Sequence, residues 1–238
     1  MMYIMAHRGA SGYAPENTMA AFRKGIESGA DCLELDVRFT KDRVPVICHD
    51  AHIGRVSNGG KQFVSDLTYD ELTEYDFGSW FSDAFAGEKI ALFEDVLKEA
   101  AKSEINLNIE LKYGPDIPEG LEKTVLDLVY TYHMEKRSMY SSFDHISLQR
   151  LYQLDNTAKI GLIFHMNLVN LFDYIKNCEM DVFSIHPNYF YITDDMVKQA
   201  HEQGMKINVY TLDDPSYVDK YKNMGVDGLI TNKLLDYK

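Results

Sequence analysis

The chain has 238 residues, of which 45% are hydrophobic, which suffices for one large domain or two small ones with a real core. The formal net charge of −13 and the scattered Lys and Arg argue against a nucleic-acid partner, since such proteins gather basic residues together. The longest apolar runs are too short to span a bilayer, so we expect no stable membrane insertion.

Strand-like apolar segments alternate with amphipathic helical segments along the chain. The expected strands cover residues 3–8, 31–40, 105–111, 138–143, 160–164, 182–186, 207–211 and 228–231. The expected helices cover residues 17–26, 92–101, 121–132, 145–154, 168–175, 194–201 and 215–221. This alternation predicts an α/β fold, a (β/α)8 TIM barrel, because about eight strands precede helices. A doubly wound open sheet is the alternative, but the first strand-to-helix turn lacks the G-x-G-x-x-G sequence of that fold.

A hairpin follows the second expected strand. Residues 44–48 return as an antiparallel strand after a turn centred near Asp42. This hairpin would bring His49 opposite Glu34 or Leu35. A histidine distant in the sequence would then lie beside the carboxylates of the second strand.

Residues 51–91 interrupt the alternation and are rich in glycine and aromatic residues. The stretch is too long for a plain loop and too aromatic for a disordered linker. We interpret it as a small insertion within a single catalytic domain of residues 1–238, packed over one end of the barrel. Its aromatic residues are expected to form its own core, and Trp80 and Phe81 are the candidates to line a pocket instead.

Three carboxylates are expected at the carboxyl ends of the strands, where TIM barrels hold their active sites. Glu34 and Asp36 are two residues apart on one strand and therefore project from the same face. With Glu110 from a neighbouring strand they form an all-oxygen cradle suited to one divalent metal ion, Mg²⁺ or Ca²⁺, rather than zinc. The alternative is ordinary ion pairing at the barrel end, with Arg8, Arg38 or Lys112.

The remaining groups suit the chemistry of phosphate esters. His7 and His49 can move protons, and Arg8 and Lys112 can contact a phosphate. This set near the strand ends predicts a hydrolase. Three further residues near strand ends could line the pocket or pack in the core: Phe143, Tyr210 and His186.

Several segments together resemble one known family. They are His7-Arg8-Gly9 through Pro15-Glu16-Asn17-Thr18, Glu34-Leu35-Asp36-Val37, His49-Asp50, Phe77-Gly78-Ser79-Trp80-Phe81, Glu110-Leu111-Lys112 and Gly225-Val226-Asp227-Gly228. The resemblance is to the glycerophosphodiester phosphodiesterases and covers nearly the whole chain. It implies a TIM barrel with a small insertion that cleaves small glycerophosphodiesters, such as glycerophosphocholine or glycerophosphoethanolamine, to glycerol 3-phosphate and an alcohol.

The resemblance also implies roles for individual residues. The positions of His7 and His49 correspond to the general acid and base of the family. Its metal ligands match Glu34, Asp36 and Glu110, and its phosphate contacts match Arg8 and Lys112. The chain departs from the family at Ala91-Leu92-Phe93, where Pro-Thr-Leu is common, and at Tyr210-Thr211, where Trp-Thr is usual. These departures concern the pocket wall, and hence the preferred leaving alcohol.

Two other functions fit the sequence less well. A phosphodiesterase for lysophospholipids or phosphatidylinositol would need a wide apolar mouth, and no amphipathic helix rich in Lys and Arg is evident. A barrel that only binds ligands would lack at least one histidine or carboxylate of the set, and none is missing.

The compartment is inferred from cysteine use and from the N-terminus. The three cysteines, Cys32, Cys48 and Cys178, lie in hydrophobic contexts without C-x-x-C spacing. We expect buried thiols in a reducing compartment rather than disulfides or a zinc site. Residues 1–6 lack a basic region, so we expect no signal peptide and a cytoplasmic protein. The sequence does not specify the oligomeric state.

Overall fold

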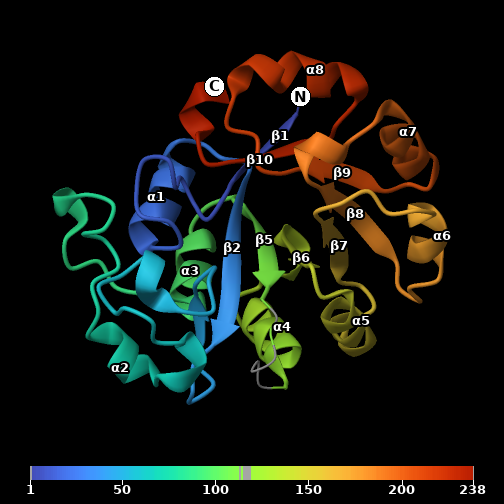
Figure 1. Cartoon of the computed structure of the whole chain (residues 1–238). Helices are drawn as coiled ribbons and strands as arrows, with labels where there is room; N and C mark the ends of the chain where they lie inside the picture. The colour runs from blue at the N-terminus through green and yellow to red at the C-terminus, as the bar shows by residue number, and fades with distance from the viewer. Residues whose placement is uncertain (1, 113, 115–118, 238) are drawn as a thin grey trace.

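The computed structural model describes residues 2–112, 114 and 119–237. Its centre is a closed barrel of eight parallel strands (Figure 1). The strands are β1 (Tyr3–Ala6), β2 (Cys32–Phe39), β5 (Asn106–Leu111), β6 (Ser138–Ser142), β7 (Lys159–Phe164), β8 (Val182–Pro187), β9 (Lys206–Val209) and β10 (Gly228–Thr231). β1 pairs with both β10 and β2, which closes the barrel. The predicted (β/α)8 fold is therefore confirmed.

Helices follow the strands and cover the outside of the barrel. They are α1 (Met19–Glu27), α3 (Phe93–Ala100), α4 (Leu121–Thr131), α5 (His145–Leu154), α6 (Leu171–Lys176), α7 (Asp194–Glu202) and α8 (Val218–Met224). A 3-10 helix, Leu234–Tyr237, follows β10 in place of an eighth α-helix. The helix expected over residues 168–175 begins three residues later. The one expected over residues 215–221 opens with a 3-10 turn before α8. Among the described residues, no helix is long and apolar enough to cross a membrane.

The alternation of side chains along each strand separates an apolar outer face from a polar interior. On β2, Leu33, Leu35 and Val37 belong to the main apolar cluster, while Glu34 and Asp36 alternate with them and are also buried. Successive side chains of a strand point to opposite faces, so the carboxylates project into the barrel. The packing between barrel and helices thereby stabilises a fold whose interior holds charged groups.

The insertion is joined to the barrel by two short strands. β3 (Pro45–Ile47) pairs antiparallel with β2, as predicted, and β4 (Ala91–Leu92) pairs with β3. Leu92 was expected to begin a helix, but it lies in β4 and precedes α3 as its N-cap. Between these strands lie three 3-10 helices, η1 (Ile53–Arg55), η2 (Val64–Asp66) and η3 (Asp83–Phe85), and the short helix α2 (Tyr69–Thr73).

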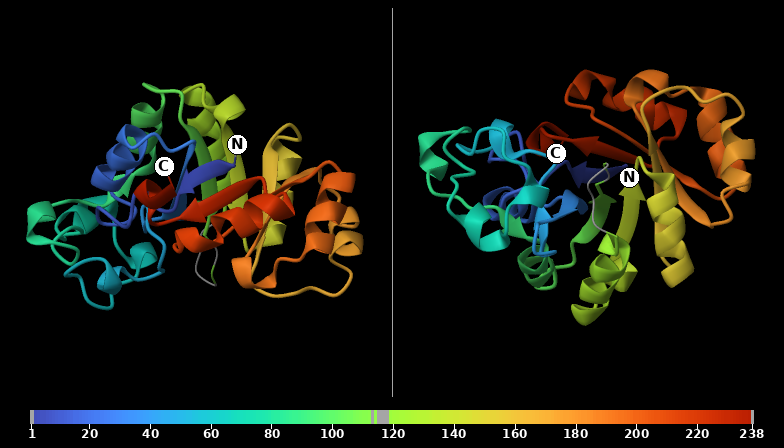
Figure 2. Two further views of the ribbon diagram at one scale, coloured as in Figure 1. Left: turned by 90° about the horizontal axis from the view of Figure 1, so that it is seen from above. Right: turned by 60° about the horizontal axis from the view of Figure 1, so that its bottom comes forward.

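The insertion has its own apolar cluster and lies beside the barrel. Its buried members are Val46, Cys48, Ile53, Val56, Val64, Leu72, Phe77 and Ile90. Figure 2 shows it on one side of the barrel, with α6 and α7 on the other. Trp80, one of the two candidates for a pocket wall, is 40% exposed and packs edge-on against the other, Phe81.

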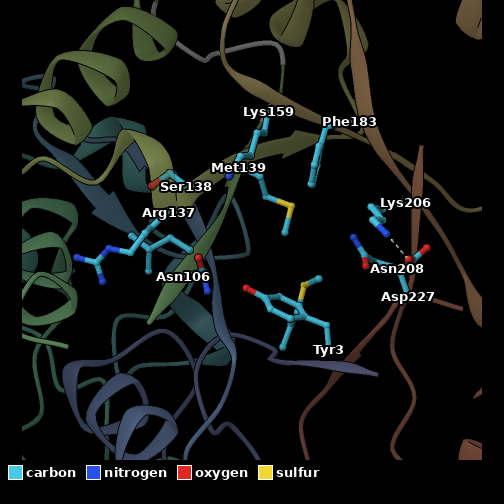
Figure 3. Close-up of a pocket in the computed structure, with 12 residues that line it drawn as sticks. Tyr3, Asn106, Arg137, Ser138, Met139, Lys159, Phe183, Lys206, Asn208 and Asp227 are labelled. Atoms are coloured by element: carbon cyan, nitrogen blue, oxygen red, sulfur yellow. Dashed lines mark hydrogen bonds and ion pairs between the residues drawn. The ribbon is translucent and has the colours of Figure 1, made fainter. Parts of the chain in front are cut away.

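The amino end of the barrel holds a cavity of about 350 Å³ (Figure 3). Its lining includes an ion pair of Lys206 with Asp227, whose nearest Nζ and Oδ1 atoms are 2.8 Å apart. Asp227 is the one carboxylate among the described lining residues, and none of those residues is a histidine. This cavity therefore lacks the histidines and the carboxylate cluster expected of the active site.

Candidate active site

The predicted site residues meet at the carboxyl ends of the strands, in a pocket of about 140 Å³. Nine residues were predicted to act in catalysis, metal binding or substrate binding. Seven of these nine line the pocket: His7, Arg8, Glu34, His49, Glu110, Phe143 and Tyr210. The other two, Asp36 and Lys112, are buried and touch the pocket lining through ion pairs with Arg8 and Glu110. His186, which the sequence left between pocket and core, also lines the pocket. Trp80 and Phe81 are not among its lining residues.

Three carboxylates form the acidic part of the site. Glu34, Asp36 and Glu110 each have an oxygen within 4.8 Å of the others, and all three are buried. The parallel register of β2 and β5 places Asp36 beside Glu110. Burial and the two neighbouring charges raise the pKa of Glu34 well above its usual value, and burial raises the pKa of Glu110 to about 7. The buried surroundings and the mutual repulsion of the carboxylates therefore disfavour the charged forms of Glu34 and Glu110.

Two cations lie against these carboxylates. Lys112 Nζ is 2.9 Å from Asp36 Oδ1 and also pairs with Glu110. Arg8 Nε is 3.6 Å from Asp36 Oδ2, and the Arg8 backbone N–H donates to Glu34 Oε2 at 2.8 Å. Although burial opposes it, Lys112 and Arg8 hold the pKa of Asp36 far below its usual value. The ion pairs considered from the sequence are thus present for Arg8 and Lys112.

Arg38 does not take part in these ion pairs. Its guanidinium instead donates to the backbone carbonyls of Cys48 and His49. Two cations against three ionised carboxylates would leave one negative charge uncompensated, in keeping with the raised pKa values of Glu34 and Glu110. Three buried polar atoms at the cluster, Arg8 Nε, Asn17 Oδ1 and Asp36 Oδ1, also lack a hydrogen-bond partner within the described part of the chain, although the first and the last lie in ion pairs. An oxygen-rich site with three crowded carboxylates and an unpartnered amide oxygen at Asn17 fits a divalent cation.

The loop after β1 carries backbone strain at the site. Arg8 and Asn17 both have positive φ, 56° and 58°, and Asn17 N–H donates to the Arg8 carbonyl at 2.9 Å. Gly9, with φ 78°, lies so close to α1 that a Cβ there would be 2.7 Å from the Ala21 carbonyl carbon. The Asn17 amide then reaches Asp36 Oδ2 at 2.7 Å. Strained non-glycine residues of this kind are typical of functional sites.

His7 is held in one tautomer by a neighbouring amide. Its Nδ1 lies 2.7 Å from Asn232 Oδ1, and the Asn232 amide nitrogen donates to Asp213 Oδ2 at 2.7 Å. Because Asn232 presents its oxygen to the ring, His7 carries its proton on Nδ1 and directs an unprotonated Nε2 toward Glu34, 4.0 Å away. Burial, with Arg8 nearby, lowers the pKa of His7 to about 4, so the ring is neutral at pH 7.

His49 is placed by the hairpin and oriented by a carboxylate. The β2–β3 register pairs Val37 with Ile47, and Cys48 N–H donates to the Asp36 carbonyl, which puts His49 level with Leu35. This is one of the two positions predicted. The ring Nδ1 lies 2.7 Å from Asp50 Oδ1, so Nε2 is the nitrogen available to the pocket. Burial lowers the pKa of His49, although nearby carboxylates oppose the shift.

Aromatic and polar side chains form the remaining wall. Phe143 and Tyr210 pack edge-to-face with ring centroids 6.1 Å apart, and the Tyr210 hydroxyl donates to the Phe164 carbonyl. Deeper in the barrel, the fully buried His186 contacts Ser184 Oγ through Nε2 at 2.8 Å. This side of the pocket wall therefore combines aromatic rings with polar side chains, opposite the charged groups.

Sequence reasoning did not assign several residues that touch the site. Asn17, Glu16 and Asp50 stand inside the quoted motifs, so a signal for them existed. Asn232, Asp213 and Arg55 lie outside the quoted motifs, and the closure of the barrel and the folding of the insertion bring them to the site.

Comparison with known proteins gives consistent matches over the whole chain. The model of the glycerophosphoryl diester phosphodiesterase family matches residues 7–235. A glycerophosphodiester phosphodiesterase of Caldanaerobacter subterraneus is 36% identical, over 96% of this chain and 93% of that protein. One from Bacillus altitudinis is 33% identical, over 98% of this chain and 95% of the relative.

Solved structures are similar as well. A glycerophosphodiester phosphodiesterase from Thermotoga maritima superposes with a TM-score of 0.77 at 27% identity, covering 99% of this chain and 96% of that one. A phosphodiesterase from Oleispira antarctica, solved with its product sn-glycerol-3-phosphate, has a TM-score of 0.87 at 24% identity, covering 99% and 94%. At 24% identity, the similarity to the Oleispira antarctica structure shows a common fold and no more.

Proposed function

The chain belongs to the glycerophosphoryl diester phosphodiesterase family and is a phosphodiesterase, and on that premise we propose that it hydrolyses small glycerophosphodiesters such as glycerophosphocholine and glycerophosphoethanolamine. The products are sn-glycerol 3-phosphate and an alcohol. One observation carries the proposal: two histidines, each with its Nδ1 engaged, flank three buried carboxylates in one pocket. The pocket volume of about 140 Å³ favours small diesters over acylated ones.

Glu34, Asp36 and Glu110 would hold one divalent cation, Mg²⁺ or Ca²⁺. The support is their all-oxygen donor set, their mutual distances and the crowding of charge that raises the pKa of Glu34 and Glu110. When bound, the cation supplies positive charge that neutralises the phosphate and stabilises the transition state. Lys112, already paired with Asp36, would move toward the phosphate or remain as the neutralising partner of the carboxylates.

His7 would act as the general base. Its neutral ring, with the proton on Nδ1, leaves the Nε2 lone pair to accept a proton from the nucleophile. His49 would act as the general acid, because Asp50 stabilises a protonated ring and Nε2 then donates to the departing alkoxide. Without that proton the alkoxide is a poor leaving group.

Arg8 and the aromatic wall would orient the substrate. The Arg8 guanidinium lies at the pocket and suits a phosphate oxygen. Phe143 and Tyr210 would contact the leaving alcohol. Two nucleophiles satisfy this arrangement: water, or the glycerol hydroxyl of the substrate, which gives a cyclic phosphate that water then opens. A substrate lacking that hydroxyl distinguishes them, because it turns over only with water as the nucleophile.

The proposal extends to the organisation and setting of the protein. Residues 1–238 would form one catalytic domain, and residues 51–91 would be a small insertion within it. The three cysteines are free thiols, in keeping with a reducing, cytoplasmic setting and a role in lipid and glycerol metabolism.

The test is release of glycerol 3-phosphate from glycerophosphoethanolamine, after treatment with EDTA and again after Mg²⁺ or Ca²⁺ is restored. We expect release to stop with the chelator and to return with one cation. Absence of release from a folded sample with either metal would refute the proposed substrates. The same assay with a lysophospholipid then tests the acylated class.

A further inference from the structure

Arg55 belongs to the insertion, yet its side chain reaches two loops of the site. Nε donates to Asp50 Oδ2 at 2.7 Å. Nη1 and Nη2 donate to the two oxygens of Glu16 at 2.7 and 2.8 Å. One guanidinium therefore joins the loop after β3 to the loop after β1.

Each of these two carboxylates also contacts a residue of the pocket. Asp50 uses its other oxygen, Oδ1, to contact His49 Nδ1 at 2.7 Å. Glu16 Oε1 also accepts from Arg8 Nη1 at 2.8 Å. A continuous path of charged contacts thus runs from His49 through Asp50, Arg55 and Glu16 to Arg8.

We infer that Arg55 is a positioning residue, which orients the His49 ring through Asp50 and the Arg8 guanidinium through Glu16. The inference deepens the proposed function and rests on it for the role of His49 in catalysis. It also assigns a task to the insertion, which supplies the side chain that joins both loops.

The geometry of the contacts requires arginine. Three nitrogens of one planar group serve two carboxylates, and its pairing with Glu16 is bidentate. A lysine in the same place offers one nitrogen and cannot hold both carboxylates in a fixed plane. Exposed ion pairs contribute little to stability. Since 42% of the Arg55 side chain is exposed, its removal should affect orientation more than folding.

The packing of the insertion fixes the backbone that carries Arg55. Ile53, two residues earlier, is fully buried in the apolar cluster of the insertion. Its N–H donates to the Gln62 carbonyl at 3.0 Å, and its carbonyl accepts from Ser57 Oγ at 2.8 Å. Gly59 leaves room for it, because a Cβ there would be 2.2 Å from Ile53 Cδ1. The guanidinium is therefore presented from a packed support.

The first experiment compares Arg55→Met, Arg55→Lys and the matched control Arg23→Met with the unaltered protein. Arg23 also pairs with a glutamate, Glu99, but on the outside of the barrel. We expect Arg55→Met to lower kcat by about 10- to 100-fold with KM changed less than about threefold, because a misplaced catalytic group loses transition-state contacts first. Arg55→Lys should recover only part of the loss, and Arg23→Met should match the unaltered protein.

Chemical rescue separates the ionic role from a general disturbance. Guanidinium at tens of millimolar should raise the activity of Arg55→Ala several-fold and leave the Arg23→Met control unchanged. Activity of Arg55→Met within about twofold of the unaltered enzyme would overturn the inference.

A second measurement does not depend on turnover. The ¹⁵N shifts of the His49 ring report which nitrogen carries the proton. At a pH where the His49 ring is neutral, the structure predicts that the proton stays on Nδ1 beside Asp50 in the unaltered protein, and that Arg55→Met shows a mixture of the two tautomers. An unchanged tautomer in Arg55→Met would overturn the inference even if no glycerophosphodiester were hydrolysed, whereas an inactive unaltered protein with the expected shifts would refute only the proposed function.

Discussion

Asn232 Oδ1 lies 2.7 Å from His7 Nδ1 and selects which ring nitrogen of His7 faces the carboxylates. The two residues are 225 positions apart and meet only because β10 closes the barrel against β1. Asp213 fixes the amide by accepting from its nitrogen. The unprotonated Nε2 of His7 therefore faces the pocket only because the barrel is closed.

Replacement of Asn232 by Leu tests this arrangement. The change removes the acceptor for the Nδ1 proton, so the two tautomers of His7 become similar in energy and fewer molecules hold a base in the pocket. We expect kcat to fall by about tenfold or more, less than the roughly 10²- to 10⁴-fold loss for His7→Ala. Steady-state kinetics measures both losses, with a thermal melt as the control for folding. Full activity of Asn232→Leu would show that the amide does not set the tautomer.

Replacement of Glu34 by Gln should separate stability from metal binding. The change removes one of three crowded carboxylates and keeps an oxygen that can accept from the Arg8 N–H. Without added metal, we expect a free energy of unfolding equal to or up to about 1 kcal/mol above that of the unaltered protein. The affinity for Mg²⁺ or Ca²⁺ should fall sharply. Denaturant unfolding and calorimetric titration measure the two effects, and undiminished metal affinity would exclude Glu34 as a ligand.

Metal affinity should depend on pH through Glu110. Its pKa is raised to about 7, so in the metal-free protein Glu110 binds protons near neutral pH. A metal ion must displace these protons. We expect affinity to weaken by up to about tenfold for each displaced proton as pH falls by one unit below 7. Titrations at pH 6.5 in buffers of different ionisation enthalpy measure proton release, and a value of zero would contradict this prediction.

Replacement of Lys112 by Met should destabilise the metal-free protein. It leaves Asp36 and Glu110 buried without their shared ammonium partner. Loss of one partner of a buried ion pair costs about 3 kcal/mol or more, although protonation of Glu110 would relieve part of it. A divalent cation should therefore raise the Tm of Lys112→Met more than that of the unaltered protein. Equal metal-induced shifts in a thermal melt would argue against direct neutralisation by Lys112.

The thiols should differ in reactivity. Burial raises the pKa of Cys48 to about 12 and that of Cys32 well above its usual value, whereas Cys178 is less buried. At pH 8 we expect one thiol, Cys178, to react with a thiol reagent in the folded protein, and all three after unfolding. Above pH 9 the unfolded Cys48 ionises while the folded one stays protonated, so its contribution to stability declines between about pH 9 and 12. Labelling followed by mass spectrometry identifies the reactive thiol.

The regular alternation of apolar and polar residues determined most of the fold. On β2, Leu33 and Leu35 alternate with Glu34 and Asp36. This period of two can be seen in the sequence alone, and the structure keeps it as two opposite faces of the strand. The predicted ends of helices and strands agree less well with the structure than their centres do. Leu92 has helical neighbours, yet pairing of β4 with β3 draws it into a strand, and such pairing is a long-range contact.

The sequence by itself determined the barrel, the family and the groups that can carry the chemistry, because each motif from His7 to Lys112 is a short local stretch and the strand period places its side chains on one face. Tertiary structure alone decided how those groups are paired and oriented. Asn232 at His7, Arg55 at Glu16 and Lys112 at Asp36 all arise from contacts between distant segments. Tautomers and pKa values depend on burial and on such neighbours, which no local pattern of residues specifies.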